Sequence, residues 1–313
     1  MTGHRLRSTA AAAIAGAATI VSIAARQPTF RATTAVVSVS VSVKRGNTVV
    51  ANLAARDFTL TDSGVPQSIE AVSIESIPID VTLFLDTSGS TSGKMDEMRE
   101  DVQSILQLLR SGDRFRLLTI GDTVEMPVAW VPAGTRVQPD LAPVGGISLI
   151  RDALLLALVH RPEPGRRHLI VGMTDRRDCG SVASNALLLD VAGRSDAVMH
   201  LVDYSGSGGD EHYRVRGCSP QAPPEGEELI ARAAERTGGD VHQQSRFFRA
   251  SSIARAFRAI FGDFRQSYVL RYSPNGVAAS GWHPIVVAVP SVRDATIRAR
   301  QGYYGTEPSR RRQ

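Results

Sequence analysis

VTLFLDTSGSTSGK, residues 81–94, joins an apolar run to a cluster of hydroxyl side chains. Residues 81–86 are mostly apolar and end in Asp86, a pattern typical of a strand buried on both faces of a parallel sheet. Residues 94–110 place methionine, valine, isoleucine and leucine at helical spacing. A buried strand, a polar loop and an amphipathic helix, in that order, indicate a parallel α/β sheet with Asp86 at the end of a strand.

The alternation of strands and helices continues to about residue 265. Strands are predicted at residues 81–86, 114–121, 123–130, 166–174 and 196–204, and helices at 94–110, 148–160, 181–194, 225–239 and 251–266. This order is typical of a doubly wound, mostly parallel sheet with helices on both faces. We therefore assign residues 79–265 to an α/β domain.

The segments on either side of this domain are rich in strand patterns. Residues 35–43, AVVSVSVSV, alternate apolar and small polar side chains, and residues 26–78 are predicted to form an N-terminal β segment. Strand patterns return after the last helix, within residues 266–305. We expect the two segments to pair into one small β unit, because both flank the α/β core. We expect the basic tail, residues 306–313, to be disordered.

Residues 1–25 have the features of an export signal. A basic start precedes an Ala-rich apolar run, and Ser22 and Ala24 form a small-x-small cleavage pattern. The chain is therefore predicted to be exported, periplasmic or secreted, with no stable membrane span after cleavage, whereas an uncleaved signal would tether it to the membrane. The chain has 36 Lys and Arg and 31 Asp and Glu. Cleavage of the signal would remove Arg5 and Arg7 and leave a net charge near +3. No basic stripe carries aromatic residues, so nucleic acid is not an expected partner.

The chain has two cysteines, Cys179 and Cys218. In an exported chain such a pair suggests one disulfide. Both cysteines are predicted in loops at the same edge of the sheet, so a bond between them is geometrically plausible. We expect it to hold the Gly- and Pro-rich insert of residues 204–226 beside that edge, where a binding loop would lie.

Carboxylates and hydroxyls converge on the carboxyl edge of the predicted sheet. Asp86 and Asp175 each follow a central strand, and sites in open α/β sheets lie beyond these strand ends. The mutual repulsion of two such carboxylates is unfavourable unless a cation or a proton lies between them. Ser88 and Ser90 stand two residues apart in the loop, so both hydroxyls can turn to one point. Such hard oxygen ligands suit Mg²⁺ or Mn²⁺.

DTSGS, residues 86–90, resembles the Asp-x-Ser-x-Ser motif of the metal-ion-dependent adhesion site in von Willebrand factor A domains. Three further stretches of this sequence also resemble that family: GGISLIRDALLLAL at 145–158, HLIVGMTD at 168–175 and AERTGGDVH at 234–242. The flanks resemble the von Willebrand A-related proteins common in Acidobacteria, through DFTLTDSGVPQSIEAVS at 57–73, SYVLRYSP at 267–274 and ARQGYYG at 299–305. The resemblance covers nearly all of the chain after the export signal.

The resemblance implies a von Willebrand A fold and a site for Mg²⁺ or Mn²⁺. Ser88 and Ser90 would bind the metal directly through their hydroxyls, and Asp86 and Asp175 would hold it mostly through water. The resemblance further implies an open coordination position that accepts a carboxylate from a protein partner.

One position departs from the family pattern. Ile147 stands where the family's Gly-Gly-Thr supplies a threonine ligand, and isoleucine cannot coordinate a metal. The next residue, Ser148, would reach the site only if the loop shifts. Arg151, Arg176 and Arg177 flank the site, and each could pair with a site carboxylate. Two interpretations stay open: a weakened site that still binds metal and an acidic ligand, or carboxylates that pair with arginine or cap helices in a fold that works without metal.

The sequence therefore predicts an exported, non-enzymatic binding or adhesion module with a degenerate metal-ion-dependent adhesion site. The alternative is a metal-free von Willebrand A scaffold for protein–protein interaction. An aspartic protease is a third reading, because Asp62-Ser63-Gly64 offers a second Asp-Ser-Gly triplet. It fits worse, since this triplet lies too close to Asp86 for an intervening β lobe and has the composition of a turn.

Overall fold

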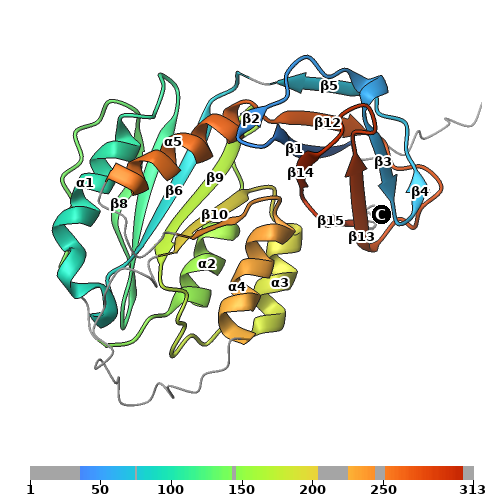
Figure 1. Cartoon of the computed structure of the whole chain (residues 1–313). Helices are drawn as coiled ribbons and strands as arrows, with labels where there is room; N and C mark the ends of the chain where they lie inside the picture. Colours follow the sequence, from blue (N-terminus) through green and yellow to red (C-terminus); the bar gives the residue numbers. More distant parts are fainter. Residues whose placement is uncertain (1–35, 75, 143–145, 204–224, 244–250, 306–313) are drawn as a thin grey trace, which may run out of the picture. The chain divides into compact units, whose positions relative to one another are not determined.

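The computed structural model describes residues 36–74, 76–142, 146–203, 225–243 and 251–305 (Figure 1). The predicted export signal, the basic tail, Gly145 and Cys218 lie outside the described residues. None of the helices in the described part of the chain is long and apolar enough to cross a membrane.

A six-stranded sheet forms the centre of the α/β domain, with the strand order β11-β10-β9-β6-β7-β8. Its strands are β6 (Ile79–Asp86), β7 (Arg114–Ile120), β8 (Val124–Pro132), β9 (Arg167–Thr174), β10 (Val198–Asp203) and β11 (Val241–Gln243). All neighbouring pairs are parallel except β7 and β8, which are antiparallel. The predicted doubly wound, mostly parallel sheet is confirmed. The short edge strand β11 pairs with β10 over three residues and was not predicted from the sequence.

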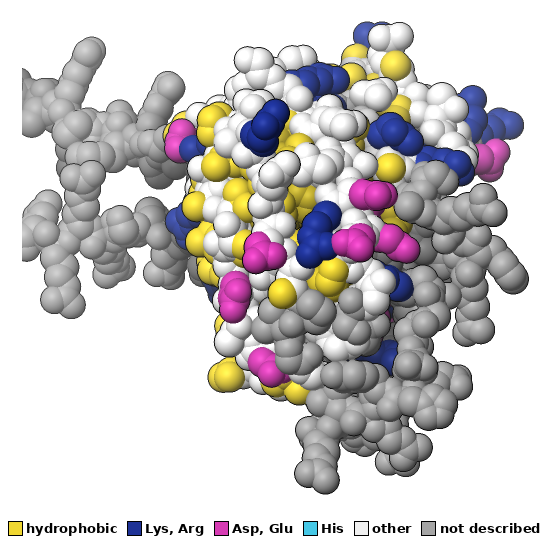
Figure 2. Space-filling view, turned by 90° about the vertical axis from the view of Figure 1, so that its left-hand side faces the viewer, with side chains coloured by type: hydrophobic (Ala, Val, Ile, Leu, Met, Phe, Trp, Pro, Cys, Tyr) yellow, Lys and Arg dark blue, Asp and Glu magenta, His cyan; other side chains and the backbone are white. Residues whose placement is uncertain are grey.

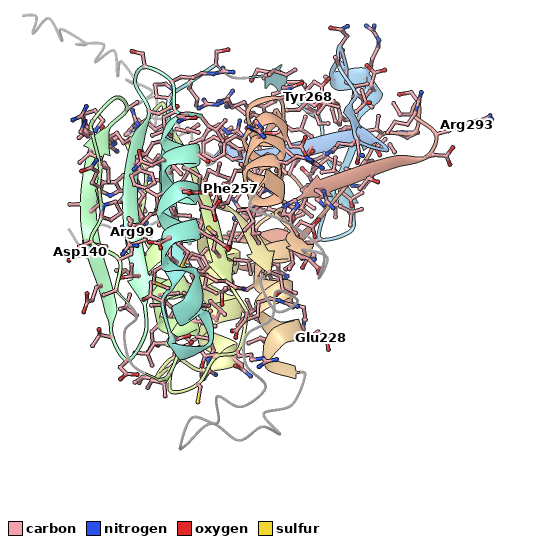
Figure 3. All side chains as sticks on the ribbon, turned by 60° about the vertical axis from the view of Figure 1, so that its left-hand side comes forward. Arg99, Asp140, Glu228, Phe257, Tyr268 and Arg293 are labelled. Atoms are coloured by element: carbon pink, nitrogen blue, oxygen red, sulfur yellow. The ribbon has the colours of Figure 1, made fainter. Side chains whose placement is uncertain are left out.

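Helices cover both faces of this sheet (Figure 1). The helices are α1 (Met95–Leu106), α2 (Ile150–Leu158), α3 (Asn185–Arg194), α4 (Glu225–Arg236) and α5 (Ser251–Arg265). Side chains of α1 and α5 pack on one face with Leu83 and Leu85 of β6, and Phe257 of α5, labelled in Figure 3, is fully buried there. Side chains of α2, α3 and α4 pack on the other face with Phe84. Successive residues of β6 thus face opposite layers, which explains its uninterrupted apolar sequence.

The flanking segments pair with each other, as the sequence predicts. One antiparallel sheet has the order β14-β1-β12-β5, with β2 added to β1, and a second has the order β15-β13-β3-β4. The strands are β1 (Val37–Arg45), β2 (Thr48–Val49), β3 (Thr59–Asp62), β4 (Val65–Pro66), β5 (Ala71–Ile74), β12 (Tyr268–Tyr272), β13 (Gly281–Ala288), β14 (Ala295–Ala299) and β15 (Gly302–Gly305). Strands from the two ends of the chain alternate in the first sheet, whereas in the second the C-terminal pair β15 and β13 adjoins the N-terminal pair β3 and β4, so neither flank completes a sheet alone.

Asp62-Ser63-Gly64 forms a turn and part of a structural cluster. Ser63 and Gly64 both have positive φ, 50° and 80°, and join β3 to β4 as a tight hairpin. The Asp62 carboxylate is fully buried. It accepts hydrogen bonds from the hydroxyls of Tyr272 at 2.9 Å and Tyr303 at 2.8 Å, and it contacts Nδ1 of His283 at 3.0 Å. Burial alone would raise the pKa of Asp62, but these hydrogen bonds outweigh it and lower the pKa.

Candidate functional site

Asp86 is the last residue of the buried strand β6, so its carboxylate lies at the carboxyl edge of the sheet. The residue has no exposed surface. Its Oδ1 accepts a hydrogen bond from the backbone N–H of Ser88 at 3.1 Å, and its Oδ2 accepts one from the hydroxyl of Thr174 at 2.9 Å. Thr174 ends β9, the neighbouring parallel strand. This contact of the Thr174 hydroxyl was not predicted from the sequence, although the place of Thr174 directly before Asp175 at a strand end could have indicated it.

The loop after Asp86 is held by its own hydroxyl groups. Thr87 donates from its hydroxyl to the carbonyl of Ile120 at 3.0 Å, which ties the loop to β7. The hydroxyl of Thr91 lies 2.6 Å from the carbonyl oxygen of Asp86 and 2.9 Å from that of Ser88. Ser88 is almost fully buried, and its side chain hydrogen-bonds Asp86. Ser90 belongs to the 3₁₀ helix η2 (Gly89–Lys94), but its side chain lies outside the described residues.

Asp175 follows β9 and is 6 % exposed. Its Oδ1 accepts a hydrogen bond of 3.0 Å from the backbone N–H of Arg177. Burial raises the pKa of Asp86 to about 6, and the nearby negative charge of Asp175 adds to this rise, against the hydrogen bonds from Ser88 and Thr174. Two aspartates therefore lie close enough at one edge of the sheet for their charges to interact.

Two of the three arginines that flank the site, Arg151 and Arg176, bind other carboxylates. Arg176, whose φ is +61°, places Nη2 at 2.6 Å from Oδ2 of Asp203. Arg151 places Nη2 at 2.9 Å from Oδ1 of Asp178, and its backbone N–H donates to Oδ2 of the same residue. The sequence left open whether these guanidinium groups pair with the site aspartates. Asp203 lies at the end of β10, and Asp178 lies in the loop that follows β9.

Lys94 also acts on the site through its charge. It ends η2 and is partly buried, and burial lowers its pKa, while the charges of Glu97 and Asp175 oppose this effect. A positive charge near Asp175 reduces the attraction of this edge for a metal cation.

The loop that carries Ile147 is the second loop at the site. Oδ1 of Asp122 accepts hydrogen bonds from the backbone N–H groups of Gly146 and Ile147, both at 3.0 Å. The hydroxyl of Ser148 donates to Oδ1 of Asp86 at 3.3 Å. The isoleucine side chain lies against Gly180. The residue that reaches Asp86 from this loop is therefore Ser148, without any rearrangement of the loop.

The donor atoms at this edge are suited to a small, hard cation. The described residues contain no cluster of three or more His, Cys, Asp or Glu side chains that could hold a metal. The site instead combines the carboxylates of Asp86 and Asp175 with the hydroxyls of Ser88, Ser148 and Thr174, and Mg²⁺ and Mn²⁺ favour such oxygen ligands. Burial and then the charge of Asp175 raise the pKa of Asp86, and a cation between the two carboxylates would reduce their repulsion.

Cys179 lies beside this second loop. Its backbone N–H donates to the carbonyl of Ser148 at 2.8 Å, and the two residues form an isolated antiparallel bridge. The partner proposed for it, Cys218, lies outside the described residues, so the disulfide stays a prediction.

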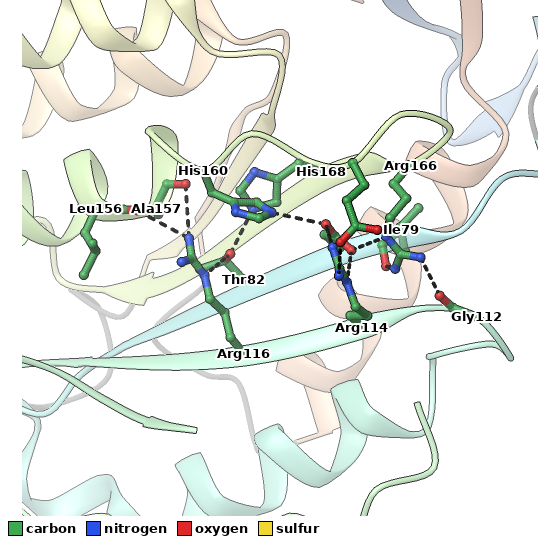
Figure 4. A network of polar contacts seen from close by, with 12 residues as sticks. Ile79, Thr82, Gly112, Arg114, Arg116, Leu156, Ala157, His160, Arg166 and His168 are labelled. Atoms are coloured by element: carbon green, nitrogen blue, oxygen red, sulfur yellow. Dashed lines mark hydrogen bonds and ion pairs between the residues drawn. The ribbon is translucent and has the colours of Figure 1, made fainter. Parts of the chain in front are cut away.

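A second polar cluster lies at the amino end of the sheet (Figure 4). The fully buried Asp80 contacts Arg114, Arg166 and His160. Burial alone would raise the pKa of Asp80, but hydrogen bonds from these three residues lower it to about 2. Every charged group there has a protein partner of its own or packs on Trp130, as the guanidinium of Arg116 does at 4.7 Å. This cluster is therefore a structural network.

No family model and no curated protein matches the sequence. Among solved structures, a von Willebrand factor type A protein from Catenulispora acidiphila is similar to this chain. The similarity covers 89 % of this chain and 76 % of the other chain, with 11 % identity and a TM-score of 0.46. The conserved hypothetical protein BatB from Bacteroides thetaiotaomicron is similar over 59 % of this chain and 98 % of its own, with 14 % identity and a TM-score of 0.42. The PilB minor pilin from Streptococcus sanguinis is similar over 61 % of this chain and 62 % of its own length, with 14 % identity and a TM-score of 0.44.

At these identities the similarities concern the fold alone, and the fold assignment rests on the strand order and helix placement described above. The chain is a doubly wound α/β protein with a polar, aspartate-containing site at the carboxyl edge of its sheet. This strand order and helix placement agree with the fold that the sequence around DTSGS predicts.

Proposed function

We propose that this chain is a non-enzymatic protein-interaction module that binds a divalent cation, Mg²⁺ or Mn²⁺, at the carboxyl edge of its sheet. Asp86, Ser88, Ser90 and Asp175 hold the cation, and an acidic side chain of a protein partner completes its coordination. We further propose that the chain is exported through residues 1–25, and that a disulfide joins Cys179 to Cys218.

The observation that carries this proposal is the pair of aspartates, Asp86 and Asp175. Both are nearly or fully buried, and the charge of one raises the pKa of the other. Buried carboxylates are costly unless they are neutralised or hydrogen-bonded. Two of the flanking arginines, Arg176 and Arg151, form ion pairs with Asp203 and Asp178.

The wider surface supports recognition at a local site. On the face shown in Figure 2, Lys and Arg side chains are interspersed with Asp and Glu among hydrophobic residues. A surface of mixed charge offers little long-range attraction to a partner of one sign. A cation with an open coordination position would supply a specific contact for a carboxylate.

The metal-free scaffold remains the second candidate, and one observation favours it. The Asp86 carboxylate accepts hydrogen bonds from Ser88, Ser148 and Thr174 without any metal. A partner would then bind the loops at this edge directly. The aspartic-protease reading has no such support, because Asp62 and Asp86 lie in different sheets and have separate sets of hydrogen-bond partners.

Calorimetric titration of the purified chain with Mg²⁺ and Mn²⁺, beside thermal unfolding with and without the metal, tests the proposal. We expect saturable binding and a raised Tm in the wild-type protein, and loss of both in Ser88→Ala. Ser291→Ala, at an exposed turn serine, is the matched control and should bind as the wild type does. Absence of binding at millimolar metal would overturn the metal proposal and leave the scaffold.

A further inference from the structure

Residues 146–149 form a loop whose backbone is anchored from two sides. The Asp122 carboxylate accepts from the N–H groups of Gly146 and Ile147, both at 3.0 Å. On the other side, the carbonyl of Ser148 accepts from the N–H of Cys179 at 2.8 Å in an antiparallel bridge. The direction of each side chain in this loop is therefore set by contacts with two other segments of the chain.

Side chains along this loop alternate, as they do in extended backbone. Gly180, with φ +113°, lies under the loop, and a Cβ at this glycine would stand 2.9 Å from Cδ1 of Ile147 and 3.3 Å from Cδ2 of Leu149. Ile147 and Leu149 thus both pack on Gly180. They can approach its backbone closely because glycine has no side chain. Ser148, between them, points to the opposite side, is 5 % exposed, and donates to Oδ1 of Asp86 at 3.3 Å.

We propose that Ser148 supplies the hydroxyl ligand that Ile147 cannot, so that Ser148 holds the cation together with Asp86, Ser88 and Asp175. A serine hydroxyl has one hydrogen to donate and two lone pairs. Ser148 can therefore keep its hydrogen bond to Asp86 while a lone pair faces a metal ion. The ligand class is a hard divalent cation, Mg²⁺ or Mn²⁺. This inference rests on the proposed metal-binding function.

The proposal also assigns a role to Ile147. The isoleucine anchors the loop on Gly180, and its apolar side chain is suited to that contact. A threonine at position 147 would place its hydroxyl against Gly180, away from Asp86. Restoring the family residue at this position alone is thus not expected to improve metal binding.

Calorimetric Mn²⁺ titration of five proteins tests this assignment: the wild type, Ser88→Ala, Ser148→Ala, Ile147→Thr and the double variant Ile147→Thr/Ser148→Ala. We expect Ser148→Ala to weaken Mn²⁺ binding at least about tenfold, since loss of even an outer-shell partner commonly costs 10- to 100-fold. Ile147→Thr should stay within about twofold of the wild type, and the double variant should bind as weakly as Ser148→Ala. Thermal unfolding in EDTA shows whether each variant is folded.

The outcomes separate this inference from the proposed function. If Ser88→Ala loses Mn²⁺ binding while Ser148→Ala keeps it, the function stands and the role of Ser148 is overturned. Restored binding in the double variant would mean that residue 147 can face the site, which also overturns the assignment. A wild-type protein that binds no Mn²⁺ overturns both.

Ser148→Cys gives an independent test should Ser148→Ala fail to fold. Sulfur favours softer cations, so this variant should lose Mg²⁺ affinity and gain Cd²⁺ affinity relative to the wild type. Cd²⁺ bound through the new thiolate would add an ultraviolet charge-transfer band that the wild type lacks. Unchanged Mg²⁺ binding without such a band would contradict the inference.

Discussion

The hydroxyl of Thr174 donates a 2.9 Å hydrogen bond to Oδ2 of Asp86, between the carboxyl ends of two neighbouring parallel strands. The same hydroxyl oxygen accepts from the backbone N–H of Arg176 at 2.9 Å. Thr174 therefore connects the buried carboxylate to the loop that carries Asp175.

We expect Thr174→Val to lower the free energy of unfolding by about 1–3 kcal/mol, because it leaves buried polar groups without a partner. Thr174→Ser keeps the hydroxyl and should lose much less. Urea unfolding at pH 7 compares the two variants with the wild type. Equal stability of Thr174→Val and Thr174→Ser would show that the hydroxyl does not stabilise the site.

Asp80 gives the stability of the protein a defined pH dependence. Its pKa in the folded protein is about 2, below the ordinary value of 3.8. The stabilisation is therefore fully present above about pH 4 and is lost as the pH falls towards 2. Asp80→Asn should cost about 3–5 kcal/mol at pH 7, because it leaves Arg114 and Arg166 without their buried carboxylate. The variant should also lack this acid-dependent loss of stability.

Urea unfolding at pH 7, 5, 4 and 3 measures both effects of the Asp80 substitution. Glu163→Gln is a suitable control, because Glu163 also pairs with Arg114 but its side chain is 69 % exposed. Exposed pairs contribute about 0–1 kcal/mol, so this variant should be close to the wild type. Parallel pH profiles for the wild type and Asp80→Asn would disprove the role of Asp80.

Lys94 is expected to weaken cation binding, since its charge acts on Asp175. Lys94→Gln should raise the affinity for Mg²⁺ about three- to tenfold at low ionic strength, which is the size of effect that one charge has at short range in a partly buried site. Calorimetric titration measures this change, with Arg110→Gln as an exposed control beyond the end of α1. Equal or weaker affinity in Lys94→Gln would contradict the prediction.

Gly172 of β9 makes room for the ring of Phe84 on the adjacent strand. A Cβ at this glycine would lie 1.8 Å from Cζ of Phe84, which is fully buried and cannot move aside freely. Gly172→Ala should therefore destabilise the protein by about 1–3 kcal/mol or more. Gly262→Ala in α5 meets only the end of Gln266 at 3.9 Å and should be neutral or stabilising. Thermal unfolding of the two variants tests the contrast, and similar Tm values would refute it.

Much of the fold is predictable because it depends on local patterns. The apolar run that ends at Asp86 and the helical periodicity after it identify a parallel α/β sheet, and the chain order of strands and helices places Asp175 at the same edge as Asp86. The pairing of the two β-rich flanks follows from their positions around the core. The edge strand β11 was missed, since three residues are too few for a periodic signal.

The sequence by itself determined the class of fold and the chemical character of its site, because burial and strand ends are encoded in the spacing of apolar and polar residues. Only the tertiary structure decided which side chains meet there. Ile147 turns to Gly180 and Ser148 to Asp86 because Asp122 and Cys179 hold the loop between them. Arg176 reaches Asp203 on a neighbouring strand. These choices depend on contacts between segments far apart along the chain, which local patterns do not specify.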